Sequence, residues 1–482
     1  MPPSLALLVW LVLLFGLLRF DPAKDSKTSL ALWVPVIWIF ILASRLPSQW
    51  LGGLVQSASQ AMEEGNSLDR SIFSLLILLS IGILMARSFN WGAFFARNVF
   101  FTAFLFFGLL SVFWSDFSFV AFKRWFRDFG NYLVILVVLS DPNPLEAIRT
   151  LFRHLCYLLV PLSILLIKYY PQTGISYEVW SGAPMYVGAT TSKNMLGVAC
   201  LVIGIFFFWD IVTRWPERKE RRIRRVIFLD FVFLGMTIWL LHLSNSATSR
   251  LCLALGCLVI AAAHTKAVKR HPAFLKILIP VCLCAYMVLE FGFDINAKIA
   301  GMVGRDPTLT GRTDLWVYLL SMHTNPLFGT GYESFWLGTR LEFVWRKYWL
   351  FNEAHNGYLE VYLNLGLIGL FLLSMFLIAS YRRIWKLAAS SVPLASLSLG
   401  VWAVTFFYNM TEAGFRGGML WMSLVIGALA IPERTEDPLP IVSRKTATGI
   451  PPHSFINRRL GKSKSGTLAS DGLQPVPQRK GR

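Results

Sequence analysis

The feature that most constrains this chain is a series of long apolar runs that contain no charge. Ser71–Met85 and Phe231–Leu241 are two of them. Only 15% of the 482 residues are charged, against roughly 25% in a soluble chain. Only helices and closed barrels satisfy their backbone groups in a bilayer, and these runs lack the period-2 alternation of barrel strands. The sequence therefore predicts an all-α fold, a polytopic transmembrane helical bundle.

We expect about 12–13 membrane spans, because each helix needs about 20 apolar residues to cross a bilayer core. The first segment lacks the basic start and the cleavage site of a signal peptide, so it is interpreted as a span. The segment near 124–140 begins with Arg124 and Arg127, so it can instead enter the membrane as an amphipathic segment. The expected spans lie near residues 4–20, 29–44, 71–87, 98–114, 124–140, 151–168, 194–213, 226–243, 250–264, 275–292, 357–380, 394–409 and 418–431.

The basic excess of the chain has two interpretations. A net charge of +19 would suit a nucleic-acid partner, but Lys and Arg gather in short connections between apolar runs, as the positive-inside rule predicts. Residues 214–225 hold seven of them against two Glu. We therefore expect membrane lipids and no nucleic acid as partners. The same rule places this connection, together with 265–276 and 381–386, in the cytoplasm.

The connections between the basic ones should face outward. They include 45–70, 169–193, 244–249 and 293–356, and an odd span count also puts Met1 outside. The last connection has about 64 residues, well beyond the usual length of a loop. It contains apolar residues at helical spacing and a Gly-rich turn. A long loop with such signals is more often functional than a structural cap.

Several cations begin or precede spans on the expected outer side. Arg250 follows the polar run Ser244–Ser249 and suits bidentate binding of phosphate, unless it reaches to lipid headgroups. Lys193 is a point charge for an anion, or equally an interfacial anchor. Arg124 and Arg127 are three apart and share a helix face. They would bind an anion if they face outward, and they are topological if they face the cytoplasm.

Two further candidates lie in the long loop and at its end. Arg312 precedes an expected helix and, taken alone, is equally typical of a solvated arginine. His355 lies where the chain re-enters the membrane, and an imidazole there can act as a general base near neutral pH. Asn356 and Glu353 can orient it or bind hydroxyls; the alternative is an interfacial histidine without a role. Tyr358 is one of several aromatic residues that can stack on sugars or form an interfacial belt.

The sequence holds no pattern typical of a metal or nucleotide site. No Cys or His cluster has metal-ligand spacing, and no Gly-rich phosphate-binding loop opens a helix after a strand. The six cysteines lie in apolar runs, which favours small buried side chains over a disulfide framework. We expect no metal and no cofactor.

Four motifs lie between residues 311 and 370. They are Gly311-Arg312-x-x-x-Trp316, Asn325-Pro326-Leu327-Phe328-Gly329-Thr330-Gly331, His355-Asn356-x-Tyr358-Leu359 and Gly366-Leu367-Ile368-Gly369-Leu370. Taken together, they resemble the O-antigen ligase and polymerase superfamily, and they are also similar to exopolysaccharide polymerases. Ser249-Arg250 and Lys193-Asn194 fit the same family.

The resemblance implies a metal-independent glycosyltransferase of the cell inner membrane with its catalytic face in the periplasm. Its donor would be a glycan on undecaprenyl diphosphate, and its acceptor a lipid A core, a growing polysaccharide or another hydroxyl. By the same resemblance Arg250 and Arg312 hold the diphosphate, and His355 activates or positions the acceptor hydroxyl. Lys193, Arg124, Arg127, Asn356 and Tyr358 are the expected substrate-binding residues.

The domain organisation follows from these expectations. Residues 1–225 form N-terminal transmembrane helices, 226–380 a ligase-related core that includes periplasmic loop 293–356, and 381–431 C-terminal transmembrane helices; 432–482 form a disordered basic cytoplasmic tail. Three alternatives remain open at this point. They are a repeat-unit polymerase, a polysaccharide transporter or flippase, and a non-catalytic scaffold.

Overall fold

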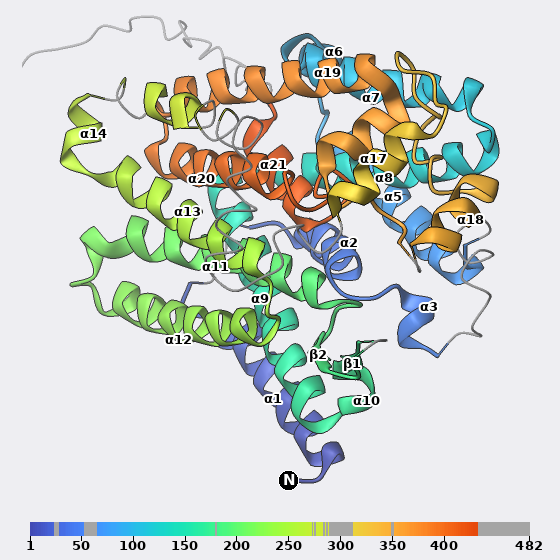
Figure 1. The fold of residues 1–482 in the computed structure, drawn as a ribbon. Coiled ribbons are helices and arrows are strands. Elements are labelled where there is room, and N and C mark those ends of the chain that lie inside the picture. The colour runs from blue at the N-terminus through green and yellow to red at the C-terminus, as the bar shows by residue number, and fades with distance from the viewer. Residues whose placement is uncertain are drawn as a thin grey trace, which may run out of the picture. The chain divides into compact units, whose positions relative to one another are not determined.

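The structure is a computed structural model, and residues 24–27, 53–64, 179–180, 272, 274–275, 283–284, 286–287, 289–311, 349–350 and 432–482 lie outside its described part. Half of the expected span at 275–292, residues 293–311 of the long loop and the whole of the expected tail therefore fall outside it. The described part is built of helices with one small hairpin (Figure 1). The fold class predicted from the apolar runs, a polytopic helical bundle, is confirmed.

The elements of the described part begin and end as follows. They are α1 (Pro3–Phe20), η1 (Leu30–Leu32), α2 (Trp33–Ala43), α3 (Pro47–Trp50), α5 (Ser67–Ala86), α6 (Trp91–Arg97), α7 (Val99–Leu110), η2 (Ser111–Trp114), α8 (Ser118–Leu139), α9 (Pro144–Tyr169), α10 (Pro171–Gly174), β1 (Ile175–Tyr177), β2 (Pro184–Tyr186), α11 (Lys193–Arg214), η3 (Trp215–Glu217), α12 (Arg221–Leu243), α13 (Ala247–His264), α14 (Lys266–Arg270), α17 (Arg312–Ser321), α18 (Gly338–Lys347), α19 (Gly357–Leu387), α20 (Val392–Tyr408) and α21 (Met419–Ala428). The strands β1 and β2 pair antiparallel, with Ile175 opposite Tyr186.

The number of spans depends on how short helices are counted. Seven described helices are long and apolar enough to cross a bilayer, and α6 with α7–η2, bent by 100°, makes up to eight. Three more apolar helices are shorter, at Leu30–Ala43, Val392–Tyr408 and Met419–Ala428. The expected 12–13 segments are helical where they are described, but length alone supports fewer of them as independent spans.

Helix α11 extends from one end of the bundle to the other. It packs against α12, α13 and α20 (Figure 1), and its 22 residues span roughly 33 Å at 1.5 Å per residue. This is close to the thickness of a bilayer core, roughly 30 Å. We call the end at Lys193 the polar end and the end at Arg214 the basic end.

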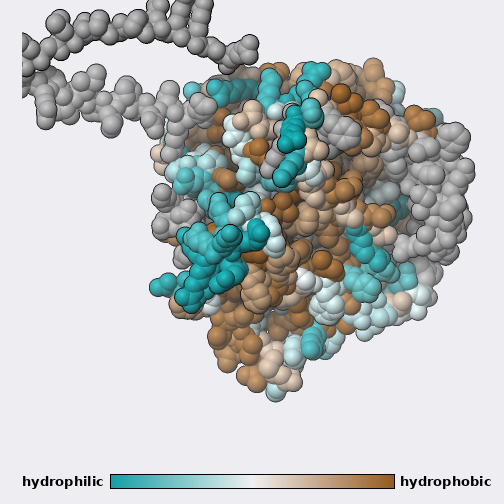
Figure 2. All heavy atoms as spheres, turned by 90° about the vertical axis from the view of Figure 1, so that its left-hand side faces the viewer, coloured by the Kyte–Doolittle hydropathy of each residue, from teal (hydrophilic) through white to brown (hydrophobic). Residues whose placement is uncertain are grey.

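The basic end carries the connection from α11 to α12. Figure 2 looks onto this side of the molecule, where hydrophilic residues gather against a largely hydrophobic surface. Helix α1 runs between the two ends: the Arg222 Nε donates to the Pro22 carbonyl at 2.9 Å, and the Tyr170 hydroxyl donates to the Pro3 carbonyl at 3.0 Å. The N-terminus therefore lies at the polar end, consistent with the expectation that Met1 and the polar connections share a side.

A break in α19 receives the Asn325–Gly331 motif. Gly366 has φ +64°, and a Cβ there would meet the Leu327 carbonyl oxygen at 2.3 Å, so only glycine fits. The backbone of Leu367 donates to the carbonyl of Pro326 at 2.9 Å. These contacts fix the loop against the helix that follows His355.

A buried ion network ties three helices together toward the basic end. Arg153 of α9 contacts Asp210 of α11 at 2.6 Å and Asp230 of α12 at 2.7 Å, and all three side chains are at most 2% exposed. Asp210 also pairs with Arg149 and Arg214. Buried charges survive only when paired, so these contacts hold α9, α11 and α12 in register.

Candidate active site

The connection from α20 to α21 lies at one side of a polar site. Asn409 fixes the shape of this connection. The Asn409 side chain donates to the Thr405 carbonyl at 2.7 Å and accepts from the Gly414 backbone at 2.8 Å. Its own carbonyl accepts from the backbone of Gly357, at the start of α19, at 2.9 Å. The connection is therefore attached both to α20 and to the segment that carries His355.

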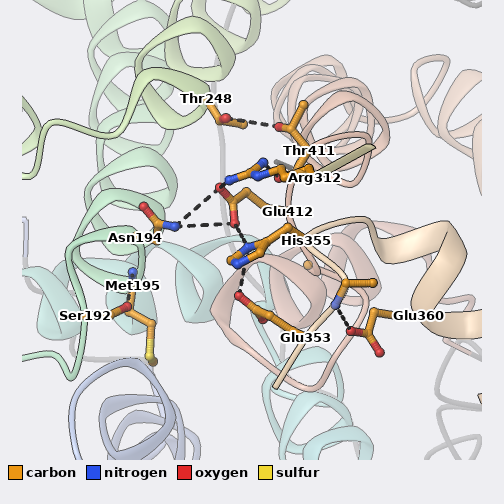
Figure 3. A network of polar contacts seen from close by, with 12 residues as sticks. Ser192, Asn194, Met195, Thr248, Arg312, Glu353, His355, Glu360, Thr411 and Glu412 are labelled. Carbon is orange, nitrogen blue, oxygen red and sulfur yellow. Dashed lines mark hydrogen bonds and ion pairs between the residues drawn. The ribbon is translucent and has the colours of Figure 1, made fainter. Parts of the chain in front are cut away.

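Glu412 lies at the centre of this connection and contacts three other elements (Figure 3). Its Oε1 is 3.1 Å from Arg312 Nη2, and its Oε2 is 3.2 Å from His355 Nδ1. The Asn194 side chain donates to the same carboxylate at 3.4 Å. The Glu412 side chain is 8% exposed. We call Asn194, Arg312, Glu353, His355, Thr411 and Glu412 the Glu412 cluster.

His355 is held in a strained conformation within this cluster. Its φ is +49°, which is uncommon for residues other than glycine and concentrates at functional sites. Its Nδ1 faces two carboxylates, Glu412 at 3.2 Å and Glu353 at 3.1 Å. Because the partner of one ring nitrogen sets the tautomer of the ring, these carboxylates favour a proton on Nδ1.

Arg312 begins α17 and is attached to the same connection. Its Nη1 donates to the Thr411 carbonyl, and its Nη2 pairs with Glu412. Arg312 and His355, two of the three residues expected to be catalytic, are thus brought together although 43 positions separate them along the chain. They approach through Glu412 and not by direct contact.

The third expected catalytic residue, Arg250, lies beside the cluster without joining it. Its Nη2 donates to the Asn245 side chain at 2.9 Å, within its own turn. Two residues earlier, the Thr248 hydroxyl bonds to the Thr411 hydroxyl at 3.0 Å, which ties the start of α13 to the site. Lys193 is the first residue of α11 and precedes Asn194, which contacts Glu412.

Arg124 and Arg127 lie on α8 and contact Glu333 and Asp128. Arg124 donates to the Glu333 carbonyl, and Arg127 pairs with the neighbouring Asp128 at 3.3 Å. Since Glu333 lies in the long loop, this contact places the arginine pair beside that loop, whereas its outward orientation stays a prediction.

Asn356 and Tyr358 make contacts that hold α19 in place. The Asn356 side chain accepts from the backbones of Tyr358 and Leu359, each at 3.1 Å, and so caps the helix. The Tyr358 hydroxyl donates to the Phe406 carbonyl at 3.2 Å, and its ring packs edge-on against Phe415. These contacts give both residues an architectural function, whereas substrate binding by them stays a prediction.

Arg416 forms a second centre next to the Glu412 cluster. It lies 3.2 Å from Glu333, 3.6 Å from Glu360 and 4.0 Å from Glu353. Burial lowers the pKa of Arg416, but the charges of Glu333, Glu360 and Glu353 outweigh it and raise the pKa overall. Arg416 therefore stays charged. Arg416, Glu333 and Glu360 line a cavity together with Asp128, and it measures about 40 Å³, room for about three waters.

Glu412, Arg416 and Asn409 were not singled out from the sequence. The sequence did contain a signal for this site, because the polar residues of Asn409–Gly418 separate two apolar runs. Counting alternate connections from the basic ones would also have placed this segment outward. Its partners, however, lie about 57–218 positions away in the chain, so pairing with them could not be read from spacing.

The Glu412 cluster also contains a group of metal-ligand type. One atom from each of Glu353, His355 and Glu412 lies within 4.8 Å of the others. Arg312 already places a positive charge 3.1 Å from Glu412, which reduces the need for a cation there. The expectation of a metal-independent reaction remains a prediction, and its test is given below.

The fold and the site define a polytopic helical membrane protein with a charge-paired polar centre at one end of its bundle. Residues 231–374 match the model of the O-antigen ligase family. The exopolysaccharide production protein ExoQ of Rhizobium meliloti is 26% identical over 358 residues, or 69% of this chain and 77% of that relative. The chain is therefore similar to membrane enzymes of the O-antigen ligase and polymerase superfamily, and the resemblance predicted from the motifs is confirmed.

Proposed function

We propose that this enzyme transfers a glycan from undecaprenyl diphosphate to an acceptor hydroxyl on the periplasmic face of the inner membrane. The observation that supports this most strongly is the pairing of Arg312 and His355 on one carboxylate, Glu412. A phosphate-binding cation and a general base are thereby held together. They lie at the end of the bundle opposite the basic connection, and the positive-inside rule puts that connection in the cytoplasm.

The reaction follows from the two functional groups. His355 Nε2 accepts the proton of the acceptor hydroxyl as its oxygen attacks the anomeric carbon of the donor. The bond from that carbon to the diphosphate oxygen breaks, and its electrons leave with undecaprenyl diphosphate. Arg312, with Arg250 and Lys193 on adjoining helix ends, stabilises the departing charge. Removing one such preorganised donor typically costs about 2.7–4 kcal/mol of barrier.

The acceptor distinguishes two versions of this function. Transfer to a lipid A core or a similar molecule would make the enzyme a ligase, and transfer to another repeat unit would make it a polymerase. The family match is to O-antigen ligases, whereas the name of the relative ExoQ refers to exopolysaccharide production. The donor half of the reaction is the same in both.

A deletion strain analysed by gel electrophoresis of its surface polysaccharides tests the proposal. Loss of glycan on the core with free polymer retained would identify a ligase, and loss of long chains with single units retained would identify a polymerase. Plasmids encoding Arg312→Ala or His355→Ala should fail to restore the product, whereas Arg340→Ala, which breaks a surface pair with Asp116, should restore it. Normal product from both site variants would refute the catalytic assignment.

A transporter is a second candidate, and one observation favours it. The ion pairs of Arg153 with Asp210 and Asp230 lie inside the bundle, and ionisable residues inside a membrane protein often line a transport path. All three are paired and fully buried, however, which favours a structural function. Movement of a lipid-linked glycan across vesicles without bond exchange would support the transporter.

A further inference from the structure

The proposed reaction assigns no role to Glu412, although Glu412 contacts both Arg312 and His355. Its two carboxylate oxygens are divided between two partners, Oε1 toward Arg312 and Oε2 toward His355 Nδ1. Asn194 donates to both oxygens, at 3.4 and 3.5 Å, which restrains rotation of the carboxylate. The side chain is also 8% exposed, so solvent competes little for these contacts.

We propose that Glu412 is the positioning residue of this site, which fixes His355 and Arg312 in one catalytic geometry. This inference rests on the proposed glycan transfer. Glu412 accepts a hydrogen bond from Nδ1–H of His355 and so leaves Nε2 unprotonated to face the acceptor hydroxyl. The same carboxylate stabilises the imidazolium that forms once Nε2 has taken the acceptor proton, as the carboxylate of a catalytic triad does.

The second contact of Glu412 orients the cation. Arg312 presents a planar fork of donors, and Glu412 and the Thr411 carbonyl hold two of them. These two contacts fix the guanidinium plane, and a bidentate phosphate contact needs a fixed plane. Because one residue holds both groups, base and cation keep a constant separation while the donor and acceptor bind.

Glu353 is the other carboxylate near His355, and its surroundings differ. It lies 3.1 Å from Nδ1, but 31% of its side chain is exposed, and its other oxygen faces Arg416 at 4.0 Å. It therefore joins His355 to the Arg416 centre and not to Arg312. Glu412 connects the two groups that the reaction requires.

Three purified variants in proteoliposomes test the inference: Glu412→Gln, Glu412→Asp and, as a control, Glu342→Gln on the exposed face of α18. Rates are measured with undecaprenyl-diphosphate-linked glycan at varied concentrations of donor and acceptor. In Glu412→Gln the amide presents N–H groups where Arg312 and His355 also donate. We therefore expect kcat of this variant to fall at least ~100-fold, within the range for general base catalysis. The acceptor KM and the melting temperature should change little. Asp should restore part of kcat, and Glu342→Gln should match wild type.

The outcomes separate the two proposals. Wild-type protein that transfers no glycan refutes the proposed function itself. If wild type transfers and Glu412→Gln keeps its kcat, Glu412 does not position the site. If both Glu412 variants lose stability in proportion to activity, the residue is structural and the inference is overturned.

Discussion

At the scale of single residues, the site is defined by how charge is distributed over a few side chains. Glu412 takes one contact from Arg312 and one from His355, while Glu353 links His355 to Arg416. Isolated buried charges are costly, and paired ones are tolerated. The two centres thus keep charged groups in place at the polar end of the bundle before any substrate binds.

Arg312→Lys tests whether guanidinium geometry matters beyond charge. Lysine keeps the positive charge but cannot bond in a planar fork to the Thr411 carbonyl and Glu412 at once. We expect the transfer rate to fall by roughly 100-fold or more, as for loss of one preorganised donor. Arg340→Lys, whose partner Asp116 is 64% exposed, should retain the wild-type rate. Equal rates for Arg312→Lys and wild type would show that charge alone suffices.

Chelation tests the group formed by Glu353, His355 and Glu412. We expect transfer to persist at the wild-type rate after dialysis against EDTA, because Arg312 supplies the positive charge that a cation would provide. Adding back magnesium, manganese or zinc should not accelerate it. A rate that falls on chelation and recovers with one of these ions would mean that the cluster holds a metal.

At the scale of elements, the motifs that carry the family resemblance divide into two kinds. Arg312 and His355 face the polar site, whereas the motifs around Asn325–Gly331 and Gly366 build the helix break on which the site rests. The apolar run at 357–380 predicted one continuous helix, and it gave no sign of this break. A positive φ at Gly366 depends on the loop that docks against it, which lies about 40 positions earlier.

Gly366→Ala should therefore disturb the whole polar end. A Cβ would meet the Leu327 carbonyl at 2.3 Å and force an unfavourable left-handed conformation. We expect lower yield in the membrane and a reduced melting temperature in detergent. The matched control is Gly235→Ala in α12, where nothing lies within 4 Å of the new Cβ. If the two variants melt alike, the break does not depend on glycine.

At the scale of the whole molecule, apolar runs and basic connections were enough to predict the helical bundle and its two ends. Helix α11 spans roughly 33 Å, and the basic connection and the polar site lie at its opposite ends, as the alternation of basic and polar connections predicts. Two features escaped this reasoning. Glu412 and the ion network around Arg153 depend on contacts between helices far apart in the chain, and one sequence does not report which helices pack together.

The ion network predicts where stability lies. Arg153→Ala leaves Asp230 buried without its partner, and breaking a buried pair costs about 3–5 kcal/mol. We expect a marked fall in melting temperature with the Glu412 cluster untouched. Arg153→Leu combined with Asp230→Leu should recover much of that loss, and Arg218→Ala on the exposed connection should have little effect. Wild-type stability of Arg153→Ala would show that the network is not structural.

The central claim is that Arg312 and His355 transfer a glycan from its lipid diphosphate. The most direct measurement follows a radiolabelled glycan and its undecaprenyl diphosphate in proteoliposomes that contain only the purified protein, donor and acceptor. We predict acceptor labelling together with equimolar release of undecaprenyl diphosphate in wild type, and loss of both in Arg312→Ala and His355→Ala. Glycan that crosses the bilayer still attached to its lipid, or equal labelling by the two variants, would contradict the claim.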